Sequence, residues 1–246
     1  MPRMTLTKSQ KKQLEELVRH YENNREHFEL ILKQLSNLFS SDKELFSQIH
    51  SMKYRVKKPS RLRDKLREKM LEASRSGERF EINRENLFER INDLAGFRIL
   101  HLYTRQIEKI NQSLLALFDE AKYRITEGPT AKTWDDESRR FFTDIGIQTE
   151  DSPSLYTSVH YVIEPNSRTK YTCEIQVRTL AEEVWGEVSH TLNYPTQIKS
   201  VACVEQINVL ARVTSSCTRL VDSIFRTSEE YRRSEAAKRR KKKSQK

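Results

Sequence analysis

The sequence predicts an α+β protein in which helices flank a mixed β-sheet. Residues 155–163 and 171–178 alternate apolar with polar side chains, as half-buried strands do, and residues 92–103 form the short apolar run of a buried strand. Residues 5–39 and 201–231 instead repeat apolar side chains at steps of three and four, which indicates amphipathic helices. Strands and helices therefore both contribute to the expected core.

The composition is that of a polar intracellular protein. The chain has 246 residues, 33% of them charged, and a mean hydropathy of −0.79, and no apolar run reaches the length of a membrane span. Three cysteines without CxxC spacing favour reduced thiols over disulfides or zinc. Because residues 1–12 also lack an apolar signal region, we expect a cytoplasmic protein that does not contact a membrane.

The net charge of +10 is concentrated at one end of the chain. Residues 232–246 hold nine Lys or Arg and one Glu, so they contribute +8 and leave +2 for the rest. Such a run is typical of contact with RNA, a ribosome or an acidic surface, but it is also typical of a solvated helix end. Both interpretations stay open.

Glycine is scarce, which limits how a nucleotide could be bound. The five glycines are too far apart for a GxGxxG or Walker A loop, and no GxSxG is present. If the protein binds a nucleotide, side chains must hold the phosphates.

A polar row lies where strand 171–178 passes into a helix. Glu174, Gln176 and Arg178 share one face about 7 Å apart, and Thr179 with Glu182 forms a capping box that ends the strand. The end of a strand is a frequent place for a binding site. We expect the helix to pack back on the sheet through an apolar stripe made of Val184, Trp185, Val188 and Leu192.

The strand at 155–163 is expected to extend this polar surface. Tyr156 and His160 share a face, and the turn that follows predicts a hairpin with strand 171–178. Antiparallel pairing then places both side chains beside Glu174 and Gln176. His160 is either part of a site or a satisfied structural histidine.

Cations gather in residues 53–70. Arg55 and Lys57 precede a proline and so lie in extended backbone, and the proline or the following serine opens a helix on which Arg61 and Lys65 share a face. Cations at a helix N-terminus suit a polyphosphate. The alternative is an ordinary solvated helix.

Asp93 stands at the start of the apolar run 92–103, where a carboxylate needs a partner such as a bound cation or Arg98. Asp93 and Arg98 have opposite parity in a regular strand, so we expect Gly96 to mark a bulge that resets the register. Residues 127–154 are polar, contain two prolines and lack periodicity, which predicts a long loop over the site.

Four segments together resemble the RelA/SpoT synthetase domain, which makes the alarmone (p)ppGpp. They are RVKKPSRLRDK, INDLAGFRI, LYTSVHYVI and EIQVRTLAEEVWGEVSHTLNY. The resemblance covers residues 50–195 and in size is nearest to the small alarmone synthetases, whose fold is nucleotidyltransferase-like. It implies an N-terminal helical extension at 1–49, a C-terminal helical region at 196–231 and a basic tail at 232–246. The apolar stripe of 201–231 (Val204, Ile207, Leu210, Leu220 and Ile224) is expected to pack or to contact another subunit.

The resemblance implies an ATP-dependent transfer of pyrophosphate to the ribose 3′-hydroxyl of GDP or GTP. Asp93 and Glu174 would hold Mg²⁺, and Glu174 would activate the hydroxyl. The ATP contacts would be Arg55 and Arg98 around the adenine and Lys57, Arg63 and Lys65 on the phosphates. The acceptor contacts would be Tyr156 stacked on the base, with His160, Gln176 and Arg178 positioning it.

Three positions depart from the family pattern. Leu155 replaces the usual Gly, Arg61 the usual Ser and Pro195 the usual Lys. The changes at 155 and 195 lie on the acceptor side, so the acceptor stays open between GDP or GTP and the 3′ CCA end of tRNA, which toxic members of the family modify. A catalytically idle RNA-binding module is a third hypothesis.

Overall fold

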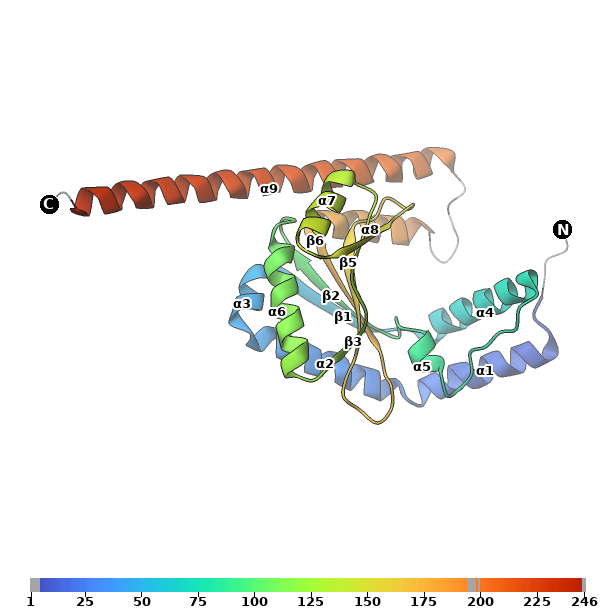
Figure 1. The fold of residues 1–246 in the computed structure, drawn as a ribbon. Helices are drawn as coiled ribbons and strands as arrows, with labels where there is room; N and C mark the ends of the chain where they lie inside the picture. The colour runs from blue at the N-terminus through green and yellow to red at the C-terminus, as the bar shows by residue number, and fades with distance from the viewer. Residues whose placement is uncertain (1–4, 194–197, 199, 245–246) are drawn as a thin grey trace.

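The computed structural model describes residues 5–193, 198 and 200–244. A six-stranded sheet lies at its centre (Figure 1). The strand order is β1-β2-β6-β5-β3-β4. The pairs β2–β6 and β3–β4 are parallel and the others antiparallel, which confirms the predicted mixed sheet. The strands are β1 (Ser51–Val56), β2 (Ala95–His101), β3 (Arg124–Thr133), β4 (Gln148–Asp151), β5 (Ser158–Glu164) and β6 (Cys173–Thr179).

Helices flank this sheet, as predicted. They are α1 (Lys8–Glu22), α2 (Arg25–Ser41), α3 (Lys43–Gln48), α4 (Pro59–Ser76), α5 (Leu87–Arg90), α6 (Gln106–Glu120), α7 (Asp136–Asp144), α8 (Leu180–Asn193) and α9 (Val201–Ser244). Within the described part of the chain, none of these helices combines the length and apolarity that crossing a membrane requires.

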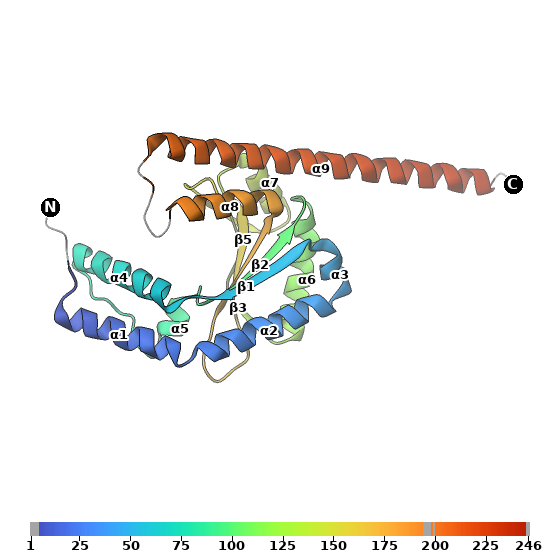
Figure 2. The ribbon, with the colours of Figure 1, turned by 180° about the vertical axis from the view of Figure 1, so that it is seen from behind.

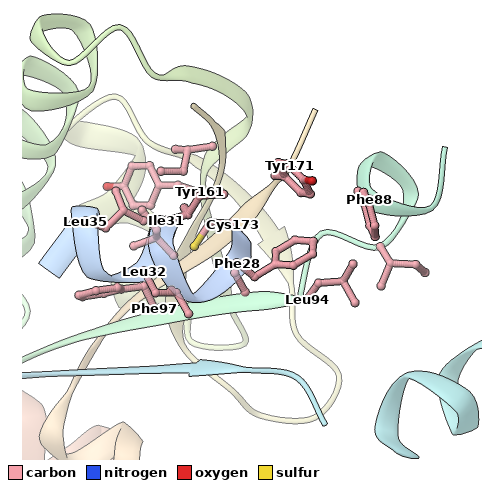
Figure 3. Close-up of a cluster of buried hydrophobic side chains, with 14 of the residues drawn as sticks. Phe28, Ile31, Leu32, Leu35, Phe88, Leu94, Phe97, Tyr161, Tyr171 and Cys173 are labelled. Carbon is pink, nitrogen blue, oxygen red and sulfur yellow. The ribbon is translucent and has the colours of Figure 1, made fainter. Parts of the chain in front are cut away.

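The apolar face of the sheet packs against α2 and α6. The alternation predicted for β6 is present, with Cys173, Ile175 and Val177 buried in the core. Figure 3 shows Phe28 and Leu32 of α2 in the same cluster as Cys173. Because successive side chains of a strand point to opposite faces, the polar residues between these apolar ones point to the other face of the sheet.

The opposite face lies under α8, and here the predicted apolar stripe is wrong. Trp185 is buried, but Val184, Val188 and Leu192 are exposed. The side chains that α8 buries also include two carboxylates, Glu182 and Glu183. The sheet beneath carries arginines, so acidic side chains complement it where apolar ones would leave charges unpaired.

The N-terminal region contains two long helices where the sequence predicts one. The interruption falls at residues 23–24, where the Asn24 side chain donates to the carbonyl of His20 at 2.8 Å. Such side-chain bonds to the backbone compete with helix continuation. Asp42 then caps α3, since its carboxylate accepts from the Leu45 amide at 2.6 Å.

Residues 127–154 do not form the expected loop. They contain most of β3, then α7 and β4. The pairing of β3 with β5 shifts register around Glu127 and again before Thr130, which removes the simple alternation from the sequence. Helix α7 is capped by Asp135, whose carboxylate accepts from the Glu137 amide at 3.1 Å.

Helix α9 crosses above α7 and α8 and then projects past the sheet (Figures 1 and 2). Its buried face is largely polar: Ile207, Ala211, Thr214, Ser215 and Thr218. Of the five residues of the predicted stripe, Ile207 is buried, Leu210 is half-buried, and Val204, Leu220 and Ile224 are exposed. The basic tail forms the end of this helix as far as Ser244. Residue 195, a predicted departure from the family pattern, lies outside the described residues.

Candidate active site

A cleft of about 540 Å³ opens between the end of β1 and the start of α4. Pro59 occupies the first turn of α4, as the sequence predicts, so the backbone leaves β1 extended and enters the helix at once. The cleft is lined by Arg55, Val56, Lys57, Lys58, Arg61, Asp64, Lys65, Glu68, Asp93 and His190. Five of these side chains are Lys or Arg and three are Asp or Glu, so the cleft has an excess of positive charge.

Asp93 faces two of the lysines. Lys57 Nζ lies 2.6 Å from Oδ2 and Lys65 Nζ lies 2.9 Å from Oδ1. Burial opposes ionisation of this carboxyl, but the two ammonium groups more than offset it and lower the pKa of Asp93. The expected bulge at Gly96 is wrong, because β2 pairs in regular register with β1 and β6. Because Lys57 and Lys65 pair with Asp93, no change of register is needed to bring Arg98 beside it.

Glu174 reaches the same region from the neighbouring strand. Gly96, the second residue of β2, lies opposite Glu174 of β6 in the parallel register, three residues after Asp93. The Asp93 charge raises the pKa of Glu174, as does burial, but His160 and Gln176 outweigh both and the pKa is lowered. His160 Nδ1 lies 3.1 Å from Glu174 Oε1, as the predicted hairpin requires.

The donor set of Asp93 and Glu174 fits a magnesium ion. Both groups offer hard carboxylate oxygens and both have lowered pKa values, so they are ionised at neutral pH. Among the described residues, no three His, Cys, Asp or Glu side chains converge as a metal site. Mg²⁺ is usually held by one or two carboxylates together with water and substrate phosphates, so a pair is sufficient.

Arg178 and Tyr156 form the far end of the polar face. Arg178 is buried, its Nη1 lies 3.4 Å from the Tyr156 hydroxyl, and its guanidinium carbon lies 5.5 Å from the centre of that ring. Tyr156 precedes β5 instead of lying in it. Leu155 before it has a φ of +60°, a conformation that favours glycine.

Arg98 is held by carboxylates of α8, which the sequence interpretation missed. Its Nη1 lies 3.3 Å from Glu183 Oε1 and 2.5 Å from Glu187 Oε1. Glu183 also pairs with Lys53 and with Arg178. The available signal was the i, i+4 spacing of Glu183 and Glu187 on a helix that follows the polar row.

Arg63 points away from the cleft in this structure, so its predicted phosphate contact stays a prediction. The resemblance implies a phosphate contact, but Nε and Nη2 of Arg63 donate to the carboxylate of Glu15 on α1 at 3.1 and 2.8 Å. Residues two positions apart on a helix point to different sides, which is why Arg63 does not line the cleft beside Lys65. Arg61 does line the cleft beside Lys65, as their spacing predicts.

The structure therefore brings most of the expected residues to one face of the sheet and its adjoining cleft. The cleft contains Arg55, Lys57, Lys65 and Asp93. The polar face contains Arg98, Glu174, Gln176, Arg178, His160 and the adjoining Tyr156.

Solved structures share this fold. The small alarmone synthetase 1 of Bacillus subtilis bound to its product pppGpp is 21% identical with a TM-score of 0.55, over 89% of this chain and 98% of that one. The same protein bound to AMPCPP is 19% identical with a TM-score of 0.51, over 89% of this chain and 99% of that one. A GTP pyrophosphokinase family protein from Streptococcus pneumoniae is 18% identical with a TM-score of 0.52, over 92% of this chain and 97% of that one.

The family follows from the sequence. A direct comparison with curated proteins gives no match. The sequence pattern described as "Region found in RelA / SpoT proteins", however, matches residues 54–199, which is more than half of the chain and spans both the cleft and the polar face. Together with the shared fold, this match shows that the chain belongs to the RelA/SpoT family.

Proposed function

We propose that this protein is a pyrophosphokinase that transfers the β,γ-pyrophosphate of ATP to the ribose 3′-hydroxyl of GDP or GTP. The observation that carries the proposal is the pair of ionised carboxylates, Asp93 and Glu174, on neighbouring strands beside a basic cleft. Solved relatives of the same fold bind AMPCPP and pppGpp, which are an ATP analogue and an alarmone. The proposed synthetase unit comprises residues 50–195.

On the donor side, the cleft replaces the glycine loop that the sequence lacks. Lys57, Lys65 and Arg61 would hold the triphosphate, and Arg55 would contact the adenine together with Arg98. Arg55 lies opposite Gly96 and Lys53 opposite Arg98 in the β1–β2 register, so both arginines share one face of the sheet. An ATP bound here would compete with Asp93 for the two lysine ammonium groups.

The transfer forms one phosphorus–oxygen bond and breaks another. The 3′-oxygen attacks the β-phosphorus, the bond to the α,β-bridging oxygen breaks, and AMP leaves with that electron pair. Glu174 would accept the hydroxyl proton, and its lowered pKa keeps it in the accepting form. Mg²⁺ held by Asp93 and Glu174 would supply neutralisation of the charge on the triphosphate.

On the acceptor side, the residues suit a nucleoside base and its phosphates. Tyr156 would stack on the base, while His160, Gln176 and Arg178 would position the acceptor. A second candidate function is transfer to the 3′ CCA end of tRNA. The projecting basic end of α9 favours it, because lysines and arginines there are exposed as far as Arg240.

Labelled ATP and Mg²⁺ incubated with GDP, GTP or deacylated tRNA would separate these functions. Label on the guanine nucleotide supports the first proposal and label on RNA the second. An absence of transfer to all three acceptors would leave the RNA-binding module without catalysis.

Glu174→Gln tests the catalytic role within the same assay. The amide cannot accept the hydroxyl proton and is a poorer magnesium ligand, so we expect kcat to fall by about 10²- to 10⁴-fold. Calorimetric titration with AMPCPP in the absence of Mg²⁺ should show that nucleotide binding is retained. Turnover close to that of the wild type would contradict the assignment.

We also propose that copies of the chain associate through α9. Val209, Val213, Leu220, Ile224 and Tyr231 are each more than half exposed on this helix. Their spacing of 4, 7, 4 and 7 residues keeps them on one line, because eleven residues complete three helical turns. Apolar stripes of this size on a surface favour protein contacts.

A further inference from the structure

We propose that Glu183 is a positioning residue that holds Arg98 on the donor side and Arg178 on the acceptor side in one fixed arrangement. The inference rests on the proposed function, because it assigns Arg98 to ATP and Arg178 to the acceptor. Glu183 touches neither reacting group. It acts through the two guanidinium groups, whose planes its carboxylate orients.

The three cations around Glu183 come from three adjacent strands. Lys53 lies on β1, Arg98 on β2 and Arg178 on β6, and these strands are neighbours in the sheet. Glu183 of α8 contacts all three cations and is 5% exposed. A carboxylate this buried is stabilised only by such partners, and burial that opposes its ionisation is offset by Arg178 and Arg98, so its pKa is lowered.

Both oxygens of Glu183 take part in these contacts. Oε1 lies 3.2 Å from Lys53 Nζ and 3.3 Å from Arg98 Nη1, whereas Oε2 pairs most closely with Arg178 Nη2. Arg98 Nη1 also lies 3.5 Å from Oε2, so this oxygen contacts both arginines and the carboxylate bridges the donor side and the acceptor side. A rotation of the carboxylate would disturb both arginines together, which makes Glu183 a link between the two halves of the site.

The backbone of α8 is shaped to permit this arrangement. A Cβ placed on Gly186 would lie 2.6 Å from Arg178 Nη1 and 3.2 Å from its guanidinium carbon. Arg178 thus fills the space that a side chain would occupy, between the helix and the Tyr156 ring. A buried arginine in contact with backbone on one side and a carboxylate on the other has little freedom to reorient.

Glu187 provides a matched control for the test. It contacts Arg98 as well, but it is half-exposed and lies one helical turn beyond Glu183 on α8. Steady-state kinetics of the full chain would compare Glu183→Gln with Glu187→Gln, measuring KM for ATP and for the guanine nucleotide. We expect Glu183→Gln to raise both KM values by about 10- to 100-fold, as for lost charged hydrogen bonds, and Glu187→Gln to raise only that for ATP.

A purely structural role for Glu183 predicts a different result. Partial unfolding lowers the concentration of active enzyme and so lowers kcat, while both KM values stay unchanged. Unchanged KM values, or a rise confined to ATP as in Glu187→Gln, would overturn the proposal. Should Glu183→Gln fail to fold, Glu183→Asp gives the same comparison, because it keeps the charge but shortens its reach, and both KM values should again rise.

Failure of the proposed function is recognised separately. If wild-type protein transfers no pyrophosphate to GDP or GTP, the function is overturned, and titration of Glu183→Gln with AMPCPP and with GDP then decides the inference. Weaker binding of both nucleotides than in the wild type supports the link. Wild-type affinity for either one contradicts it.

Discussion

At the scale of single residues, Leu155 shows how one position can be strained and packed at once. Its φ of +60° is unfavourable for a side chain with a Cβ, by about 1 kcal/mol. The same side chain packs against the cluster of Trp185, Ile207 and Ala211. The usual glycine of the family, implied by the resemblance, fits the backbone conformation without the packing.

Substitution separates these two effects. Leu155→Ala loses the packing and keeps the strain, whereas Leu155→Gly loses the packing and relieves the strain. We therefore expect the glycine variant to be the more stable of the two by about 1 kcal/mol. At an ordinary backbone position alanine is instead more stable than glycine. Denaturant unfolding of both variants would measure the difference. An alanine variant more stable than the glycine variant would contradict the strain.

Glu182 predicts a pH dependence of stability. Burial raises its pKa to about 7 from the usual 4.5, although the Thr157 amide donates to its Oε2 at 3.4 Å. Because the folded state holds this proton more tightly than the unfolded state, the stabilisation is complete below pH 4.5 and is lost as the pH rises through 7. The loss amounts to about 3 kcal/mol at most.

Glu182→Gln removes this titration while it keeps an acceptor oxygen for the Thr157 amide. The unfolding free energy of the variant minus that of the wild type should therefore be larger at pH 8 than at pH 5. Free energies of unfolding from urea titrations at the two pH values would measure this gain. A difference between variant and wild type that is equal at both pH values would show that Glu182 is ionised in the folded state.

The site residues on strands were predictable because a strand has a period of two. Glu174, Gln176 and Arg178 had to share a face, and the hairpin had to bring His160 beside them. The partners of Arg98 were not predictable in the same way. They depend on the rotation of α8 over the sheet, which only the tertiary contacts determine.

At the scale of elements, α8 explains why periodicity can mislead. A stripe of Val184, Val188 and Leu192 usually marks the buried side of a helix. Here those residues are exposed, because the sheet face below presents Arg98 and Arg178 and requires carboxylates. The segment at 127–154 was missed for a related reason, since the register shifts in β3 erase the alternation that identifies a strand.

Asp222 of α9 joins two elements through a helix cap. Helix α6 has no side-chain cap of its own, and Asp222 accepts from the backbone amides of Thr104 and Arg105 at 3.2 and 3.1 Å. Asp222→Ala should cost about 1 kcal/mol of unfolding free energy, because both amides lose their acceptor. Hydrogen exchange at Thr104 and Arg105 would check this, since both amides should lose protection in the alanine variant, whereas Asp222→Asn keeps an acceptor oxygen for only one of them.

At the scale of the whole molecule, α9 has two different surfaces. One is polar and holds the helix on the body through contacts such as Thr218 with Thr179 at 3.3 Å and Ser215 with Asp135 at 3.0 Å. The other is the exposed stripe from Val209 to Tyr231. Since the inward contacts do not use the stripe, its apolar residues are available to a second copy of the chain.

Leu220→Glu tests whether the stripe joins copies of the chain. Leu220 is 63% exposed at the middle of the stripe, so a charge there should weaken association without disturbing the fold. Light scattering coupled to gel filtration should show a mass above 29.2 kDa for the wild type and a shift towards that value for the variant. Arg232→Glu, an exposed position outside the stripe, should leave the mass unchanged. A wild-type mass of one chain, or equal shifts in both variants, would contradict association through this surface.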